Sequence, residues 1–139
     1  AAYLAWLDAR TIRFGFAGEL ANLSDRVRDG VSNTTPPETL WPAIVPTVRL
    51  VELVRERFGP TSLHSAYRSP AYNRAVATST DSRHSHNDAI DFSCSTGTPK
   101  DWALFLRGLR DAGTFTGGIG LYKTFVHVDT RGTVADWKG

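Results

Sequence analysis

Cysteine is nearly absent from this chain of 139 residues, because Cys94 is the only one. A single cysteine excludes an internal disulfide and a metal site built from several thiolates. Its neighbours in the sequence are apolar, so we expect a buried thiol that packs as a small hydrophobic side chain. Long apolar runs are also absent, since no stretch approaches the roughly 18 consecutive apolar residues that a membrane span needs.

Charge of one sign is scarce as well. The 16 basic and 14 acidic residues give a formal net charge of +2, and no run of Lys or Arg stands out. This excludes a dedicated nucleic-acid-binding protein, which usually carries a basic stripe or patch. No signal peptide is predicted, because no basic segment precedes an apolar one in AAYLAWLDAR (1–10). A content of 41% hydrophobic and 22% charged residues is typical of a globular protein, and the length predicts one domain over 1–139.

A long helical pattern follows the double proline at 36–37 and ends at Gly59 and Pro60. Pro42 and Pro46 interrupt it, so its first turns are expected to be kinked or separate. The apolar residues recur at steps of three and four and therefore share one face. They are Leu40, Ile44, Val48, Val51, Val54 and Phe58.

Shorter elements surround this helix. A second amphipathic helix is predicted over 100–111, and a short strand over 61–66 and a short helix over 69–77 precede it. The region 21–38 is polar and rich in turn formers, which predicts a surface loop. The first 35 residues give no clear elements, so the readable core is 36–139.

Two strand-like runs flank the second helix, AIDFSC at 89–94 and FVHVDT at 125–130, and the glycine-rich GGIGLY (117–122) precedes the latter. Short strands and helices mixed without a regular βαβ rhythm predict an α+β domain. We expect a small antiparallel sheet packed by helices.

Alternation along these two strands separates polar from apolar side chains, because successive side chains point to opposite faces. The apolar face consists of Ile90, Phe92, Cys94, Val126 and Val128. If the two strands are neighbours, Asp91, His127 and Asp129 project together from the opposite face.

His84 lies seven residues before Asp91, and a turn through HSHND is long enough to bring its ring over the same face. Two imidazoles and one carboxylate, with a fourth position left for water, are the arrangement expected of catalytic zinc. Nitrogen and oxygen ligands without thiolate favour zinc over other divalent metals. Zinc activates its water and polarises a carbonyl, so this pattern points to peptide hydrolysis.

The sequence segments around these residues resemble those of the zinc D-Ala-D-Ala peptidases. These enzymes share a fold with VanX-type dipeptidases and the hedgehog signalling domain. The first ligand motif of that family, Ser-x-His-x-x-x-x-Ala-x-Asp, matches 82–91, although many members have Gly where Asn87 stands. The ending FVHVDTRG (125–132) followed by Trp137 is similar to that of the cell-wall branch. SAYRSPAYN (65–73) resembles the family segment that carries a substrate-facing arginine, and LWPAIVP and GGIGLY occur in the expected order.

The resemblance runs from about Pro36 to the C-terminus. It implies a hedgehog/DD-peptidase-like fold and one zinc ion as cofactor, and it implies the metal ligands His84, Asp91 and His127. It also implies that Arg68 holds the scissile carbonyl oxygen or a substrate carboxylate, a role suited to a planar, always-charged group. The alternative for Arg68 is a surface salt bridge in a turn. Tyr67 and Ser82 are expected to line the same substrate-binding pocket.

The general base is not assigned by the resemblance. Relatives often carry an acidic base three residues before the last ligand or a histidine two before it, and here Thr124 and Phe125 stand at those positions. Asp129 is the first candidate, because it projects from the same strand face as His127. The alternative for Asp129 is a structural bond, for instance to Arg131. His86 is the second candidate, with an exposed loop position as its alternative.

His64 also lies at a strand position, close to Arg68 in the chain, and a structural role is expected for it.

The resemblance predicts a zinc peptidase that hydrolyses stem peptides or cross-links of peptidoglycan, as a D,D- or L,D-carboxypeptidase or endopeptidase. It implies action on the cell envelope, as a periplasmic, extracellular or phage-encoded enzyme, and a monomer without nucleic-acid or membrane partners. Two alternatives stay open. One is a binding module that keeps the fold and the zinc without cleaving, and the other is a structural component of a phage tail or envelope assembly.

Overall fold

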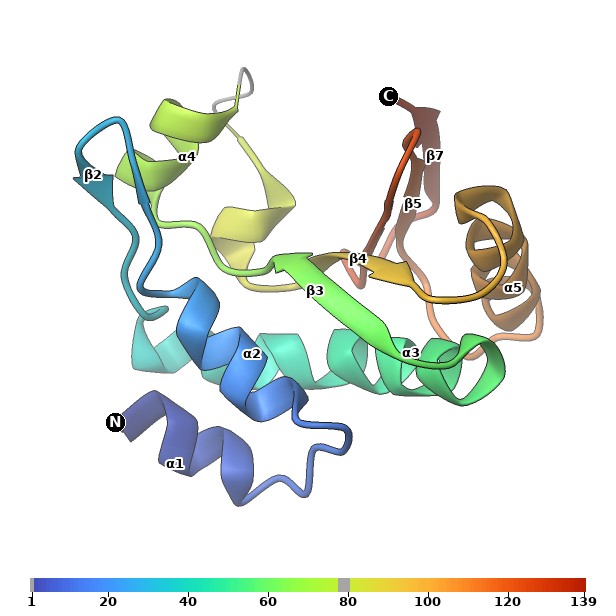
Figure 1. Cartoon of the computed structure of the whole chain (residues 1–139), viewed down its shortest axis with the longest axis horizontal. Coiled ribbons are helices and arrows are strands. Elements are labelled where there is room, and N and C mark those ends of the chain that lie inside the picture. The colour runs from blue at the N-terminus through green and yellow to red at the C-terminus, as the bar shows by residue number, and fades with distance from the viewer. Residues whose placement is uncertain (1, 78–80) are drawn as a thin grey trace.

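A five-stranded sheet in the order β3-β4-β6-β5-β7 organises the protein, shown as a computed structural model in Figure 1. The structure describes residues 2–77 and 81–139. The strands of this sheet are β3 (Thr61–Ser65), β4 (Ala89–Cys94), β5 (Gly118–Leu121), β6 (Val126–Asp129) and β7 (Ala135–Lys138). The helices are α1 (Ala2–Asp8), α2 (Phe16–Leu23), α3 (Ile44–Phe58), α4 (Pro70–Val76) and α5 (Pro99–Asp111), with two short 3-10 helices, η1 (Glu38–Ala43) and η2 (Arg83–His86).

The predicted α+β class is confirmed. Strands β3, β4, β6 and β5 pair antiparallel, as expected, whereas β7 pairs parallel to β5. Figure 1 shows α3 running beneath β3 and β4, with α5 at the other end of the sheet and the C-terminus beside β7. Helices therefore pack on one face of the sheet, and the polar side chains of β4 and β6 are left to the other.

Helix α3 explains how the prolines fit into the predicted helical pattern. The turns around Pro42 form the separate 3-10 helix η1, and the α-helix begins at Ile44. Pro46 is the third residue of α3, where a backbone N–H has no partner inside the helix and a proline is tolerated. Five of the six predicted apolar residues are buried along α3: Ile44, Val48, Val51, Val54 and Phe58.

The first 35 residues contain more structure than their sequence indicates. Helices α1 and α2 pack into the same core as the sheet. Their buried apolar side chains are Tyr3, Leu7, Phe16, Ala17, Leu20 and Leu23. The loop predicted for 21–38 is therefore wrong at its start, because α2 continues through Leu23, and β1 (Val27–Arg28) and β2 (Val31–Ser32) form a small exposed hairpin within it.

Helix α5 follows its predicted bounds closely. Its N-terminus carries a capping box, in which Thr98 accepts a hydrogen bond from the backbone of Asp101 and the Asp101 side chain accepts one from the backbone of Thr98. Trp102 and Leu106 are buried against the sheet. None of the helices in the described part of the chain has the length and apolar character that a membrane crossing requires.

Cys94 ends β4 and is half-buried, so it is less enclosed than the sequence predicts. Its sulfur lies 3.3 Å from the Thr61 hydroxyl. Burial raises the pKa of the thiol, with the Thr61 contact acting in the opposite direction.

Candidate metal centre

Strands β4 and β6 are neighbours, and Asp91 stands directly opposite His127 in their register. Their apolar side chains, Ile90, Phe92, Val126 and Val128, are fully buried in the core. Because side chains alternate along a strand, this burial turns Asp91 and His127 to the opposite face together. The predicted pairing of the two strands is confirmed.

His84 reaches the same face from η2, which precedes β4. The Ser82 hydroxyl accepts a hydrogen bond from the backbone N–H of His84 and so caps η2. The chain then turns at Asn87, whose φ of 59° lies in the left-handed region. Glycine adopts this conformation without strain and asparagine tolerates it, so Asn87 suits this turn.

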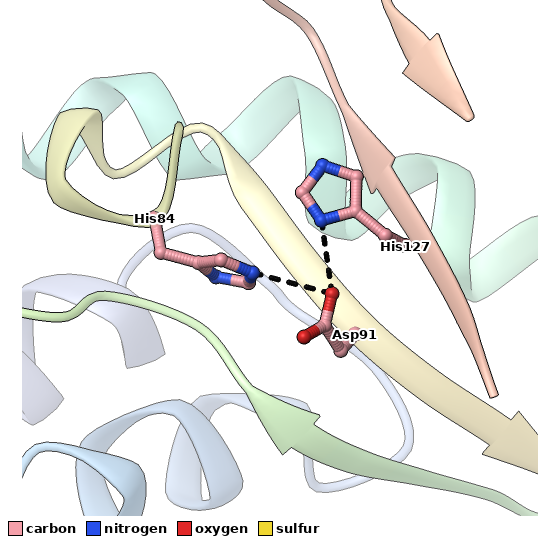
Figure 2. Close-up of side chains that lie close together, drawn as sticks. All are labelled: His84, Asp91 and His127. Atoms are coloured by element: carbon pink, nitrogen blue, oxygen red, sulfur yellow. Dashed lines mark hydrogen bonds and ion pairs between the residues drawn. The ribbon is translucent and has the colours of Figure 1, made fainter. Parts of the chain in front are cut away.

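One ligand atom from each of the three residues converges on a single point (Figure 2). His84, Asp91 and His127 each offer an atom that lies within 4.8 Å of the other two. His84 Nε2 lies 3.2 Å from Asp91 Oδ1, and His127 Nδ1 lies 3.0 Å from the same oxygen. Two ligand atoms bound to one tetrahedral zinc at about 2.0–2.1 Å are about 3.3 Å apart. The residues present therefore fit a zinc ion.

The outer nitrogen of each imidazole is occupied, which decides which nitrogen faces the centre. His84 Nδ1 lies 2.7 Å from the backbone carbonyl of Ala66, and His127 Nε2 lies 2.8 Å from Asp129 Oδ2. With each outer N–H donating to an oxygen, the inner nitrogen of a neutral ring is the one that would bind a metal. Outer hydrogen bonds of this kind orient metal-binding histidines in proteins.

Asp129, the first candidate for the general base, is fully buried and saturated with hydrogen bonds. Besides His127, its carboxylate accepts bonds from the Gly118 backbone N–H at 2.9 Å and from the Arg131 guanidinium at 2.7 and 2.9 Å. The alternative that Asp129 bonds to Arg131 is confirmed. Burial acts to raise the pKa of Asp129, but the bonds from His127, Arg131 and Gly118 outweigh it and hold that pKa well below its usual range.

The two central groups polarise one another. Burial acts to raise the pKa of Asp91, yet the charge of His84 and the hydrogen bonds from His127 and His84 hold it well below its usual range. Burial acts to lower the pKa of His127, and its bonds to Asp129 and Asp91 outweigh this, so the pKa is raised. Asp91 is therefore an ionised carboxylate, the form in which it binds a metal.

A cleft of about 830 Å³ opens over the three residues, and its lining combines cationic and aromatic side chains. The cations are Arg68, Arg83 and Arg131, and Tyr122, Phe125 and Trp137 form a group that we call the aromatic wall. The Arg131 guanidinium lies 5.2 Å from the Trp137 ring, so cations and aromatic rings adjoin. This lining suits a ligand that carries both carboxylates and small apolar groups.

Arg68 lies in the cleft and is partly buried, with 18% of its side chain exposed. Its guanidinium is 3.7 Å from Asp91 Oδ2 and donates to the Ser65 hydroxyl at 3.0 Å and to Asn73 Oδ1 at 3.4 Å. Arg68 thus lies beside the predicted metal ligand Asp91, and not in a salt bridge on the surface, the alternative considered from the sequence. Ser82 lines the cleft, whereas Tyr67 does not and borders a separate small cavity of about 20 Å³.

The aromatic wall was not predicted from the sequence as a site feature. Trp137 Nε1 donates to the Tyr122 hydroxyl at 3.0 Å, and the Trp137 ring lies 4.9 Å from the ring of His127. The Tyr122 and Phe125 rings stack at 4.4 Å. A Cβ at Gly120 would lie 2.6 Å from the Trp137 ring, so the glycine-rich strand β5 makes room for this wall. The segment GGIGLY (117–122) and Trp137 were the sequence features from which this wall could have been predicted.

The remaining histidines lie outside the cleft. His64 is exposed on β3, with Nε2 2.6 Å from the Ser93 hydroxyl. His86, the second candidate base, is also exposed and lies 3.1 Å from Asp81, a residue at the cleft rim. The exposed position expected as the alternative for His86 is confirmed.

The family model described as Peptidase M15 matches residues 15–129, which include the three residues of the cluster and Arg68. Comparison with curated proteins and with solved structures gave no match.

Proposed function

The chain belongs to the peptidase M15 family of zinc metallopeptidases, and on this premise we propose that it hydrolyses peptide bonds in the stem peptides or cross-links of peptidoglycan. The observation that carries the proposal is the convergence of His84 Nε2, Asp91 Oδ1 and His127 Nδ1 in the lining of a cleft of about 830 Å³. We propose that these three residues hold one zinc ion.

When bound, zinc supplies a Lewis acid for the scissile carbonyl and lowers the pKa of a water molecule to roughly 7. The protein's own part is to hold the ligands in one geometry. Ala66 O and Asp129 fix the two imidazole rings from outside, so little reorganisation is needed on metal binding.

Arg68 is proposed to bind the substrate oxygen that becomes negative, or a substrate carboxylate. Its guanidinium lies beside Asp91 and is held by Ser65 and Asn73, so its position is set before substrate arrives. Donors that are pre-positioned toward developing charge act without reorganisation, and removing one typically costs about 10²–10³-fold in kcat.

Asp129 is proposed to orient His127 and not to accept a proton from water. It is fully buried, does not line the cleft, and its carboxylate is engaged by His127, Arg131 and the Gly118 backbone. Asp81 is the other carboxylate among the cleft-lining residues that the structure describes, besides Asp91. We propose it as the first residue to test for proton transfer, and Asp81→Asn should then lower kcat while zinc stays bound.

The substrate class rests on the chemistry of the cleft lining. Peptidoglycan stems combine free carboxylates with alanine methyl groups, and these match the arginines and the aromatic rings that line the cleft. The proposal covers both D,D- and L,D-bonds, and it places the action of the chain, as a monomer, at the cell envelope.

The experiment is digestion of purified peptidoglycan by the zinc-loaded protein, with released peptides and new termini identified by mass spectrometry. We expect soluble peptides from the wild type, loss of release with a chelator, and recovery with added zinc. His84→Ala should abolish release, whereas His64→Ala, which removes an exposed histidine outside the cleft, should leave it unchanged.

Zinc binding without peptide release from peptidoglycan of several chemotypes would contradict the proposal. That result would favour the non-cleaving binding module, which the residues Thr124 and Phe125 at the expected base positions make the main competitor.

A further inference from the structure

The four residues 66–69 form the link between β3 and α4 and include Arg68. Their backbone is held along both edges. On one edge lies the candidate ligand His84, and on the other lies Asn33, from the segment before η1 whose sequence gave no functional signal.

The bonds to His84 run in both directions. The Arg68 backbone N–H donates to the His84 carbonyl at 3.2 Å, and the His84 ring donates from Nδ1 to the Ala66 carbonyl at 2.7 Å. Any shift of this segment therefore moves both the Arg68 side chain and the oxygen that orients His84.

The bonds to Asn33 hold the opposite edge. Asn33 Nδ2 donates to the carbonyl of Tyr67 at 2.8 Å and to that of Leu23 at 3.1 Å, and Asn33 Oδ1 accepts from the Ser69 N–H at 2.9 Å. One side-chain amide thus bonds the residues on both sides of Arg68 and ties them to the end of α2. Asn33 is buried, with 6% exposed, so water does not replace these bonds.

We infer that Asn33 is a positioning residue for Arg68, and through the same segment for His84. A smaller side chain at 33 leaves the Tyr67 and Leu23 carbonyls and the Ser69 N–H without partners in a buried site, which the backbone relieves by moving toward water. A displacement of about 1 Å at a catalytic group is enough to cost up to roughly 10²-fold in rate. This role in catalysis rests on the proposed peptidase activity.

The test is a double-mutant cycle on Asn33→Ala and Arg68→Ala, with turnover of peptidoglycan peptides measured at saturating zinc. We expect Asn33→Ala to lower kcat by about 10-fold and Arg68→Ala by about 100-fold. The double variant should equal Arg68→Ala within about 2-fold. Saturating zinc fills the metal site in every variant, and the remaining effect of Asn33 on kcat passes through an Arg68 side chain that is already gone.

Thr98→Ala is the matched control. It removes a polar side chain that caps α5, outside the residues that line the cleft, and should leave kcat unchanged in both backgrounds. Effects of Asn33→Ala and Arg68→Ala that multiply fully would show a general structural role for Asn33 and overturn the inference.

Amide hydrogen exchange at Arg68 provides a readout that does not need activity. In Asn33→Ala the Arg68 amide should exchange at least 10-fold faster, while amides of α5 stay protected. In Thr98→Ala the amides of the first turn of α5 should exchange faster, while the Arg68 amide stays protected. An inactive wild type would reject the proposed function alone, because the exchange result still decides whether Asn33 holds this segment. Unchanged exchange at Arg68 would reject the positioning role.

Discussion

His127 Nε2 lies 2.8 Å from Asp129 Oδ2, and this bond leaves Nδ1 as the nitrogen that faces Asp91. Asp129→Asn keeps the shape but removes the charge that holds the ring. We predict that zinc affinity falls by about 10–100-fold, the usual cost of losing such an outer partner. Competition with a chelating indicator measures this directly.

Asp136→Asn is the control for that prediction. Asp136 pairs with Arg110 at 2.8 Å and is largely exposed on β7, so zinc affinity should not change. If Asp129→Asn keeps full zinc affinity but loses turnover at all pH values, the carboxylate acts on the reaction itself and the orienting role is wrong.

Asn87 supplies a test of the turn that carries His84 toward Asp91. Asn87→Gly and Asn87→Ala both lose the bond from Asn87 Nδ2 to the Leu40 carbonyl, so their difference isolates the backbone conformation. At a φ of 59° the Gly variant should be more stable than the Ala variant by about 1 kcal/mol. Denaturant unfolding measures the difference, and equal stabilities would contradict the strained turn.

Gly120 tests whether the position of the Trp137 ring matters for the substrate. In Gly120→Ala the added Cβ would lie 2.6 Å from the Trp137 ring, which must then leave its place over β5. We predict at least a 10-fold loss of kcat/KM and a changed tryptophan emission spectrum, with zinc bound as before. Gly108→Ala, at a helical site with open space around it, should retain activity, and full activity of both variants would exclude the aromatic wall from substrate binding.

Tyr3 predicts how stability changes at alkaline pH. Burial raises its pKa to about 12, with a hydrogen bond to Asn87 acting in the opposite direction. Because the pKa is higher in the folded than in the unfolded chain, the stabilisation is complete below about pH 10 and is lost as pH rises toward 12. Tyr3→Phe should show a smaller decrease in unfolding free energy over this interval, and an unchanged decrease would contradict the burial of the phenol.

The sequence predicts those parts of the fold whose side chains pack regularly. Strand β4 and helix α5 were predicted nearly to the residue, because alternation and a capped apolar stripe are local patterns. Helix α1 has only seven residues and β7 only four, too few for a period to be recognised in the sequence. Their structure depends on tertiary contacts, such as the pairing of β7 with β5.

The candidate site also has a part that could be predicted from the sequence and a part that could not. Side chains that would touch the metal stand in a recognisable motif, and the structure brings His84, Asp91 and His127 together as predicted. Asp129, two residues from His127, orients that ring, whereas the Ala66 carbonyl that orients His84 and the Asn33 side chain that holds the Arg68 segment act across long sequence separations. Hydrogen bonds to backbone atoms leave no residue pattern, so sequence reasoning could not find them.

Zinc stoichiometry is the most direct test of the central claim that three side chains form one metal site. Protein prepared with zinc and dialysed free of excess metal should contain one ion per chain in the wild type and in His64→Ala, measured by elemental analysis. His84→Ala, Asp91→Ala and His127→Ala should each contain nearly none while remaining folded by circular dichroism. Zinc retained in full by these variants, or absent from the wild type, would contradict the account.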